Sequence, residues 1–250
     1  MAARKYVMSI AGFDPSGGAG VLADIKTFEQ LNVYGFGVCS ALTVQTDSEF
    51  LSVEWMSVSQ VIDQAIPLIR KFPLQFLKLG LMKDVDSCLE IVRRLKREQP
   101  HLHITWDPVL KSSSGFTFYD PLLSGPLESL LRECFLITPN YLEAGLLTSN
   151  GNIELAMGEL QSLANVLLKG GHHPTMPGHD FLYLKNGPIK QFMPRESNAS
   201  GKHGSGCVLS AAIVAYLSQG FDLTEACYKA KKYAYQFLIS NDSLLGYHHG

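Results

Sequence analysis

Residues 6–28, YVMSIAGFDPSGGAGVLADIKTF, contain the pattern that decides the fold. An apolar run leads into a glycine-rich turn, and the turn opens a helix. The run lacks a clean apolar–polar alternation, which is typical of a strand buried on both faces of a parallel sheet. A strand, a turn and a helix in this order form the first half of a βαβ unit, so the stretch predicts a parallel sheet covered by helices.

The same alternation continues along the chain. Residues 85–95 and 223–237 carry apolar side chains at helical spacing, and five further apolar runs read as strands. These predicted strands are 35–43, 74–80, 102–107, 134–138 and 165–170. The pattern predicts an α/β fold with a mostly parallel central sheet and helices on both faces. No linker or repeat interrupts it, so we expect a single domain over residues 1–250.

Local signals refine this prediction. Asn186-Gly187 separates two short apolar runs and predicts an antiparallel hairpin within residues 181–193. Ser57 with Gln60, and Asp222 with Glu225, have the spacing of helix capping boxes.

The composition limits the classes of function. Hydrophobic residues make up 46% and charged residues 18% of the 250 residues, as in ordinary globular proteins. A net charge of -2 argues against a general nucleic-acid or anionic-membrane binder. The cysteines, Cys39, Cys88, Cys134, Cys207 and Cys227, form no CxxC or metal-binding pattern. Free thiols and an N-terminus without a signal-peptide pattern predict a soluble, cytoplasmic protein.

A second glycine-rich stretch, HGSGC at 203–207, stands in front of a predicted helix. Backbone N–H groups and the positive end of the helix dipole converge at such a position, so it suits an anion. The alternative is a plain loop with a serine cap. Cys207 falls in the first helical turn. A helix N-terminus lowers the pKa of a thiol, so this position predicts that Cys207 acts as a base or a nucleophile. The alternative, which the local sequence alone favours, is a small buried residue.

Other polar residues follow the predicted strands. Asp107, Asn140 and Lys169 end three strands, Glu143 lies one helical turn after Asn140, and Asp24 lies about two turns into a helix starting near Gly17. Acids at such an edge suit Mg²⁺ and a lysine suits phosphate. Each has a structural alternative: a cap, a first-turn acid or a surface charge. Together with two glycine-rich loops they predict phosphoryl transfer.

At this point the chain resembles the hydroxymethylpyrimidine/phosphomethylpyrimidine kinases of the ribokinase-like superfamily. The resemblance runs from about residue 5 to 240 and rests on motifs in the same order: AGFDPSGGAGVLADIKTF (11–28), ALTVQT (41–46), DPVL (107–110), TPNYLEA (138–144), KGGH (169–172) and HGSGC (203–207). It implies a three-layer α/β/α sandwich with a mostly parallel sheet, and ATP and Mg²⁺ as cofactors.

The resemblance also implies residue roles. Gln45 would hydrogen-bond the aminopyrimidine, and Cys207 would be the base that takes the hydroxyl proton. The remaining implied sites are the pocket lining Gly12, Ala19, Asp24 and Val109; the anion hole Gly204, Ser205 and Gly206; the ATP contacts Lys169, Asn140 and His203; and the metal ligands Glu143 and Asp107.

The chain departs from the family pattern at four places. These are Phe13, the loop KSSSGF at 111–116, Lys202 before the anion-hole histidine, and the C-terminal LLGYHHG. They affect the details expected for substrate clamping and phosphate binding.

The resemblance predicts phosphorylation of 4-amino-5-hydroxymethyl-2-methylpyrimidine and of its monophosphate in thiamine biosynthesis. The alternative is a pyridoxal kinase, and a third interpretation is a non-catalytic pyrimidine-binding protein. Gln45 favours the pyrimidine, and Lys169, Glu143 and Cys207 argue for catalysis. Family members often form dimers, so we expect a homodimer.

Overall fold

The protein is described by a computed structural model that covers residues 4–112, 115–121, 126–148, 152–173, 175–194 and 201–249. Its strands form one nine-stranded sheet in the order β3-β2-β1-β4-β5-β6-β7-β8-β9. The strands are β1 Tyr6–Phe13, β2 Tyr34–Gln45, β3 Phe50–Trp55, β4 Phe76–Leu79, β5 His103–Trp106, β6 Leu136–Ile137, β7 Asn165–Leu168, β8 Asp180–Tyr183 and β9 Ile189–Phe192. The run from β2 to β7 is parallel, and β3, β8 and β9 join antiparallel. The predicted mostly parallel sheet is confirmed.

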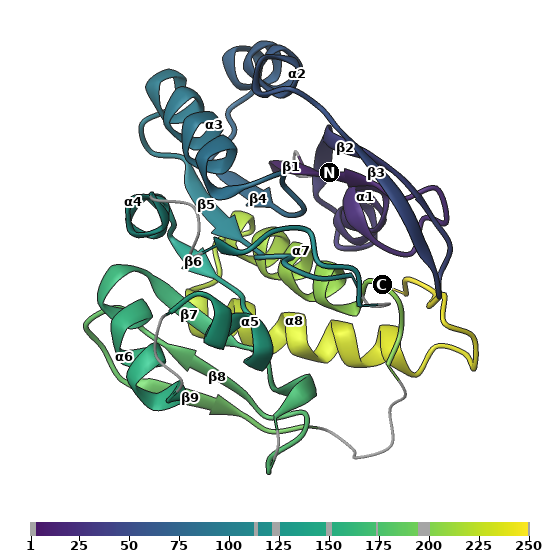
Figure 1. Ribbon diagram of the computed structural model, residues 1–250, viewed down its shortest axis with the longest axis vertical. Coiled ribbons are helices and arrows are strands. Elements are labelled where there is room, and N and C mark those ends of the chain that lie inside the picture. The colour runs from purple at the N-terminus through teal and green to yellow at the C-terminus, as the bar shows by residue number, and fades with distance from the viewer. Residues whose placement is uncertain are drawn as a thin grey trace.

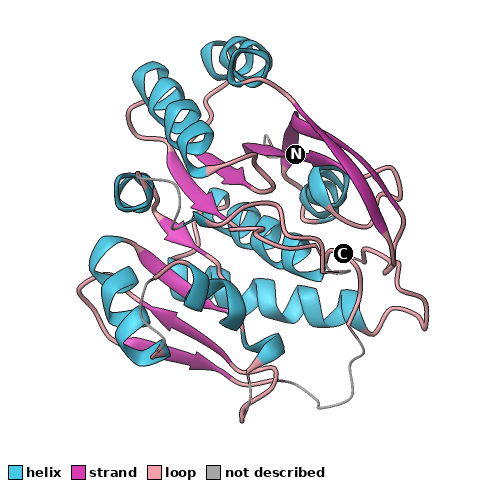
Figure 2. Cartoon of the chain, in the orientation of Figure 1, coloured by secondary structure: helices cyan, strands magenta, loops and turns pink. Residues whose placement is uncertain are grey.

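Helices cover both faces of the sheet (Figures 1 and 2). One core cluster joins α1, α7 and α8 to the sheet, and a second joins α2, α3, α4 and α6. Val7 belongs to the first cluster and its neighbour Met8 to the second, because successive side chains of a strand point to opposite faces. The helices are α1 Gly20–Gln30, α2 Val58–Lys71, α3 Val85–Glu98, α4 Leu127–Glu133, α5 Tyr141–Leu146, α6 Ile153–Leu163, α7 Ser205–Ser218 and α8 Leu223–Leu238. The three-layer α/β/α arrangement is therefore confirmed.

The local signals behave as their chemistry requires. Ser57 and Gln60 form a reciprocal capping box at the start of α2. At the start of α8 only half of the predicted capping box forms: the Asp222 side chain accepts a hydrogen bond from the Glu225 backbone, while the Glu225 side chain lies near Lys229. Asn186 has φ 57° in the turn between β8 and β9, which confirms the hairpin.

Strand β3 is absent from the sequence-based prediction. It is an edge strand that pairs only with the outer half of β2, from Ala41 to Gln45. Its side chains are exposed or half-buried, so it carries no apolar run of the kind that marks the central strands. Among the helices of the described ranges, none is long and apolar enough to cross a membrane.

Candidate active site

Two adjoining cavities open at the carboxyl edge of the parallel strands. The smaller, of about 490 Å³, lies between the ends of β1, β2, β4 and β5 and the start of α7. The larger, of about 770 Å³, extends along α7 and α8. Both are lined by Lys169, Gly171, Lys202, His203, Ser205 and Gly206. The structure thus brings the two glycine-rich loops and most of the predicted polar residues to one place, with the start of α7 between the cavities.

The glycine-rich turn stands at the start of a helix, as predicted, and its role in anion binding stays a prediction. α7 begins at Ser205, and its N-cap is Gly204, which has φ 72° and no side chain to cap the helix. A Cβ atom on Gly204 would lie 2.0 Å from the Gly18 carbonyl oxygen, so the two glycine-rich loops touch through bare backbone. Residues 204–207 line the smaller cavity, and the first N–H groups of a helix have no partner within the helix, so this turn would suit an anion.

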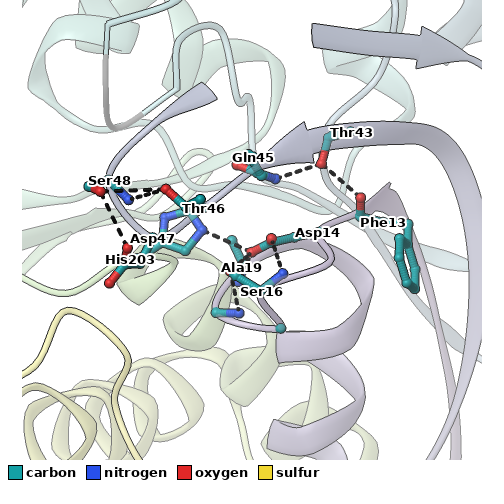
Figure 3. A network of polar contacts seen from close by, with 12 residues as sticks. Phe13, Asp14, Ser16, Ala19, Thr43, Gln45, Thr46, Asp47, Ser48 and His203 are labelled. Carbon is teal, nitrogen blue, oxygen red and sulfur yellow. Dashed lines mark hydrogen bonds and ion pairs between the residues drawn. The ribbon is translucent and has the colours of Figure 1, made fainter. Parts of the chain in front are cut away.

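A side-chain network ties the two loops together (Figure 3). His203 Nε2 lies 2.9 Å from Asp14 Oδ2, and Asp14 also accepts hydrogen bonds from the Ser16 and Ala19 backbones at 2.8 Å each. Burial raises the pKa of Asp14, but hydrogen bonds from His203 and Ser16 outweigh it, and the pKa falls below its ordinary value. The sequence analysis missed Asp14; its signal is an aspartate two residues before a serine at the start of a loop.

Lys169 is the centre of a second polar cluster. Its Nζ lies 2.7 Å from Asp107 Oδ1 and 3.9 Å from Glu143 Oε2. Asp107 also accepts hydrogen bonds from Thr138 and Ser210, both at 3.0 Å. Burial and Asp107 raise the pKa of Glu143 to about 7, because the nearby Lys169 offsets only part of the effect. Burial raises the pKa of Asp107 as well, but Lys169 and Lys78 outweigh it, and the carboxylate stays ionised.

Asn140 and Glu143 also have the structural roles given above as alternatives, a helix cap and a first-turn acid. The Asn140 side chain accepts a hydrogen bond from the Glu143 backbone N–H at 2.9 Å, and the Glu143 carboxylate accepts one from the Asn140 backbone N–H at 2.8 Å. The two residues thus form the capping box of α5. Both nevertheless line the smaller cavity. A helix cap and a ligand contact are compatible here, because each residue keeps polar atoms beyond those that the cap uses.

We expect Glu143→Gln to stabilise the protein at pH 8 but not at pH 5. The folded-state pKa of about 7 lies above the ordinary value of 4.5, so folding loses free energy as the pH rises through this interval. Glutamine stays neutral and retains the cap. The free energy of unfolding should rise by on the order of 1–3 kcal/mol at pH 8. Thermal melts at both pH values check this, with the exposed Glu128→Gln as control; equal shifts at both pH values would contradict it.

Cys207 lies at the floor of the smaller cavity, half-buried, in the first turn of α7. The predicted lowering of its pKa is wrong. Burial raises the thiol pKa to about 11; Lys78 opposes this, while Asp24 and Asp107 add to it. Desolvation and two buried carboxylates outweigh the start of the helix, and the resting group is a thiol.

Asp24 does not line either cavity, so its predicted place in the pocket wall is wrong. α1 starts at Gly20 rather than near Gly17, which puts Asp24 one turn into the helix instead of two. Its side chain is fully buried, where it forms an ion pair with Lys78 and accepts from Ser9 at 2.6 Å. The Asp24 carboxylate therefore holds Lys78 in the core next to the site and does not face a ligand.

Gln45 ends β2 at the wall of the smaller cavity. Its Nε2 donates to Thr43 Oγ1 at 2.8 Å, and the Thr43 hydroxyl donates to the Phe13 carbonyl at 2.8 Å (Figure 3). The chain of bonds fixes the amide plane and leaves Oε1 and one N–H for a ligand. Gly12, Ala19 and Val109 line the same cavity, as predicted.

Lys202 is one of the four departures from the family pattern, and its ammonium group bonds to the C-terminal part of the chain. Its Nζ donates to Asn241 O, Asn241 Oδ1 and Ser243 O at 2.6–2.8 Å. The neighbouring His203 N–H donates to Leu244 O at 3.0 Å. Lys202 thus holds Asn241 and Ser243, just before the C-terminal departure LLGYHHG, and the His203 backbone holds Leu244, the first residue of that departure. Ser113 and Ser114 of the loop KSSSGF, and Gly250, lie outside the described residues.

The comparisons with known proteins agree with this geometry. A family model described as phosphomethylpyrimidine kinase matches residues 14–250. The hydroxymethylpyrimidine/phosphomethylpyrimidine kinase of Salmonella typhimurium is 33% identical over 258 residues, which cover 96% of this chain and 93% of the relative. The thiamine biosynthesis bifunctional protein ThiED of Geobacter sulfurreducens is 33% identical over 92% of this chain, which spans 48% of that longer protein.

Solved structures give the same picture. The phosphomethylpyrimidine kinase of Clostridium difficile has a TM-score of 0.77 at 32% identity, covering 92% of this chain and 98% of that one. The ADP complex of a Bacillus subtilis pyridoxal kinase has a TM-score of 0.78 at 26% identity, covering 92% and 90%.

Proposed function

Because the chain belongs to the phosphomethylpyrimidine kinase family, and is therefore a kinase, we propose that it phosphorylates 4-amino-5-hydroxymethyl-2-methylpyrimidine and then its monophosphate, with ATP as the donor. The observation that carries the proposal is the pair of cavities that share Lys169, Lys202, His203, Ser205 and Gly206 in their walls. A phosphoryl group at that shared wall would face both an acceptor in the smaller cavity and a donor in the larger one.

The smaller cavity suits a small heteroaromatic alcohol. Its volume of about 490 Å³ falls in the range of ligand pockets, and Gln45 offers one donor and one acceptor on its wall. We assign the pyrimidine edge to Gln45 and the hydroxymethyl group to Cys207. The thiolate form of Cys207 would accept the hydroxyl proton, and the N–H groups of the first turn of α7 would hold the phosphoryl oxygens.

We assign ATP to the larger cavity, with its phosphates directed at Lys169, Asn140 and His203. His203 Nδ1 is buried and has no hydrogen-bond partner among the described residues, so it has capacity for a ligand. The ADP complex of the Bacillus subtilis relative supports a nucleotide site on this fold.

The residues present fit a magnesium ion. The Glu143 carboxylate takes backbone hydrogen bonds from Asn140 and Leu110, and it shares the Lys169 ammonium group with Asp107, at 3.9 and 2.7 Å. Mg²⁺ in kinases is held by one or two carboxylates together with water and substrate phosphates, so a full cage of protein ligands is not required. When bound, the ion neutralises charge on the phosphate oxygens. Glu143 and Asp107 would hold it.

A test of the proposal is ADP release by the purified protein with ATP and Mg²⁺, on addition of the hydroxymethylpyrimidine, pyridoxal or no acceptor. We expect release with the pyrimidine, and mass spectra that show the monophosphate and then the diphosphate. Release with pyridoxal alone would favour the pyridoxal kinase alternative, for which the Bacillus subtilis relative is the supporting observation. Binding of the pyrimidine without ADP release would favour a non-catalytic binding protein.

Gln45→Ala should raise the KM for the pyrimidine and leave kcat within a few-fold. The loss of directional hydrogen bonds in a half-buried wall should cost on the order of 1–3 kcal/mol of binding. Thr43→Val is the matched variant, because it removes only the anchor of the amide and should have a smaller effect. An unchanged KM in Gln45→Ala would remove this role.

We further propose that residues 1–250 act as one kinase domain, in the cytoplasm, and that the protein is a homodimer. One sheet that takes strands from residue 6 to residue 192 supports the single domain. Leu42 and Val44 support the dimer, since they lie on one face of β2 and remain 45% and 55% exposed. Light scattering measures the mass directly.

A further inference from the structure

Lys78 is a charged residue inside the central strand β4, whose other residues are Phe76, Leu77 and Leu79. Its side chain is fully buried. Burial of a cation is unfavourable unless the group is paired and hydrogen-bonded, and a well-packed apolar residue often serves stability as well or better. The position of this charge, beneath the cavity that contains Cys207, therefore requires an explanation that general packing does not supply.

The contacts of Lys78 join α1 to the start of α7. Its ammonium group forms an ion pair with Asp24 Oδ1 from α1, and Ser9 holds the other carboxylate oxygen at 2.6 Å. The same ammonium group lies 3.3 Å from the backbone carbonyl oxygen of Cys207. One buried cation thus contacts the residue that carries the cavity thiol.

We propose that Lys78 is a positioning residue for phosphoryl transfer: through its bond to the Cys207 carbonyl and its charge, it fixes the first turn of α7 and biases the thiol toward its ionised form. Asp24 holds Lys78 in place. The proposal rests on the function proposed above, because it assigns the thiol and the helix start to the reaction.

The charges around the thiol support this assignment. Four charged groups, Lys78, Lys169, Asp24 and Asp107, act electrostatically on Cys207 or are acted on by it. Of these groups, Lys78 has the largest lowering effect on the thiol pKa, whereas Asp24 and Asp107 raise it. The ion pair is therefore not neutral in its effect on Cys207: removal of Asp24 alone and removal of both partners should differ.

The competing interpretation is an ion pair that only stabilises the fold. Two variants separate the interpretations without leaving an unpaired carboxylate in the core. Asp24→Asn removes the negative charge and leaves Lys78 facing Cys207, but its one amide oxygen replaces only one of the two carboxylate oxygens that accept separately from Ser9 and Lys78. The double variant Lys78→Met/Asp24→Asn removes both charges and the bond to the Cys207 carbonyl. Melting temperatures show whether each variant is folded.

The first readout needs no kinase activity. Iodoacetamide alkylation of Cys207 at pH 8 is followed by peptide mass mapping. The rate should be about threefold or more faster in Asp24→Asn than in the wild type, and slower in the double variant than in Asp24→Asn. Cys88, which is fully buried in the opposite core cluster, is the internal control. Equal rates in the two variants would overturn the proposal, whatever the substrate of the protein proves to be.

The second readout is turnover. If Lys78 positions the reacting groups, the double variant should fold with a melting temperature near that of the wild type, keep KM within about threefold and lose tenfold or more in kcat. A double variant that keeps wild-type kcat would overturn the proposal, and a lower melting temperature with unchanged kcat would show that the pair serves the fold alone. Absence of ADP release by the wild type would count against the proposed function, and the alkylation result would then decide the role of Lys78 by itself.

Discussion

Replacement of Cys207 by alanine is expected to lower kcat by about 10²–10⁴, the range typical of a lost general base. The thiol lines the smaller cavity at the start of α7, where the acceptor hydroxyl is proposed to lie. Folding should be little affected, because alanine favours helix and the lost volume is small. Substrate KM should change much less than kcat.

The control for this variant is Cys39→Ala. Cys39 is also a free, half-buried thiol, but it lies on β2 and lines neither cavity. We measure kcat and melting temperature for both variants. A folded Cys207→Ala protein with wild-type kcat would mean that Cys207 only packs, and that the helix start and Lys169 act through positioning and electrostatics.

The pH dependence of the wild type gives a sharper form of the same prediction. With a thiol pKa of about 11 in the free protein, kcat/KM should keep rising with pH through pH 9. This slope should be absent from Cys207→Ala. Cys207→Asp places a carboxylate base at the same position and should recover part of the lost kcat.

The second large effect is expected for Gly204→Ala. Gly204 has φ 72°, and an added Cβ would lie 2.0 Å from the Gly18 carbonyl oxygen. The two loops must then separate, and the N–H groups at the start of α7 must shift with them. Loss of one preorganised donor to a developing negative charge costs about 10²–10³ in kcat, and we expect at least this loss here.

Gly201→Ala is the matched control, because a Cβ atom there meets no other atom within 4 Å. The measurement is kcat with melting temperature for both variants. Gly204→Ala should also melt at a lower temperature, since left-handed backbone strains an alanine. A Gly204→Ala protein with wild-type kcat would show that the turn does not hold the transferred group.

The parallel strands and the two glycine-rich loops could be predicted from sequence because their signals are local. An apolar run such as 74–80 marks a buried strand, and the glycines at 204 and 206 mark a helix start that needs bare backbone. The edge strand β3 lacks such a run, because exposed edge positions accept polar residues. Its pairing with β2 is a property of the sheet and not of residues 50–55 alone.

The errors within the site have a common physical origin. The thiol pKa of Cys207 and the position of Asp24 both depend on Lys78, which comes from a strand far away in sequence. Desolvation is a sum over all surrounding atoms, so a local motif cannot give its size. The one visible signal was a lysine inside the apolar run LQFLKLG, which marks a buried charge in need of a partner.

The bond between His203 and Asp14 joins residues from opposite ends of the chain, so it can form only late in translation. The nine strands of the described residues lie within residues 6–192, and the helix start that faces Asp14 is translated only afterwards. Until α7 and α8 leave the ribosome, Val7, Leu136 and Leu167 have no helices from the C-terminal part to cover them. We therefore expect nascent chains that stop before residue 203 to expose this apolar face and to need chaperones, and the proposed catalytic centre to be completed last.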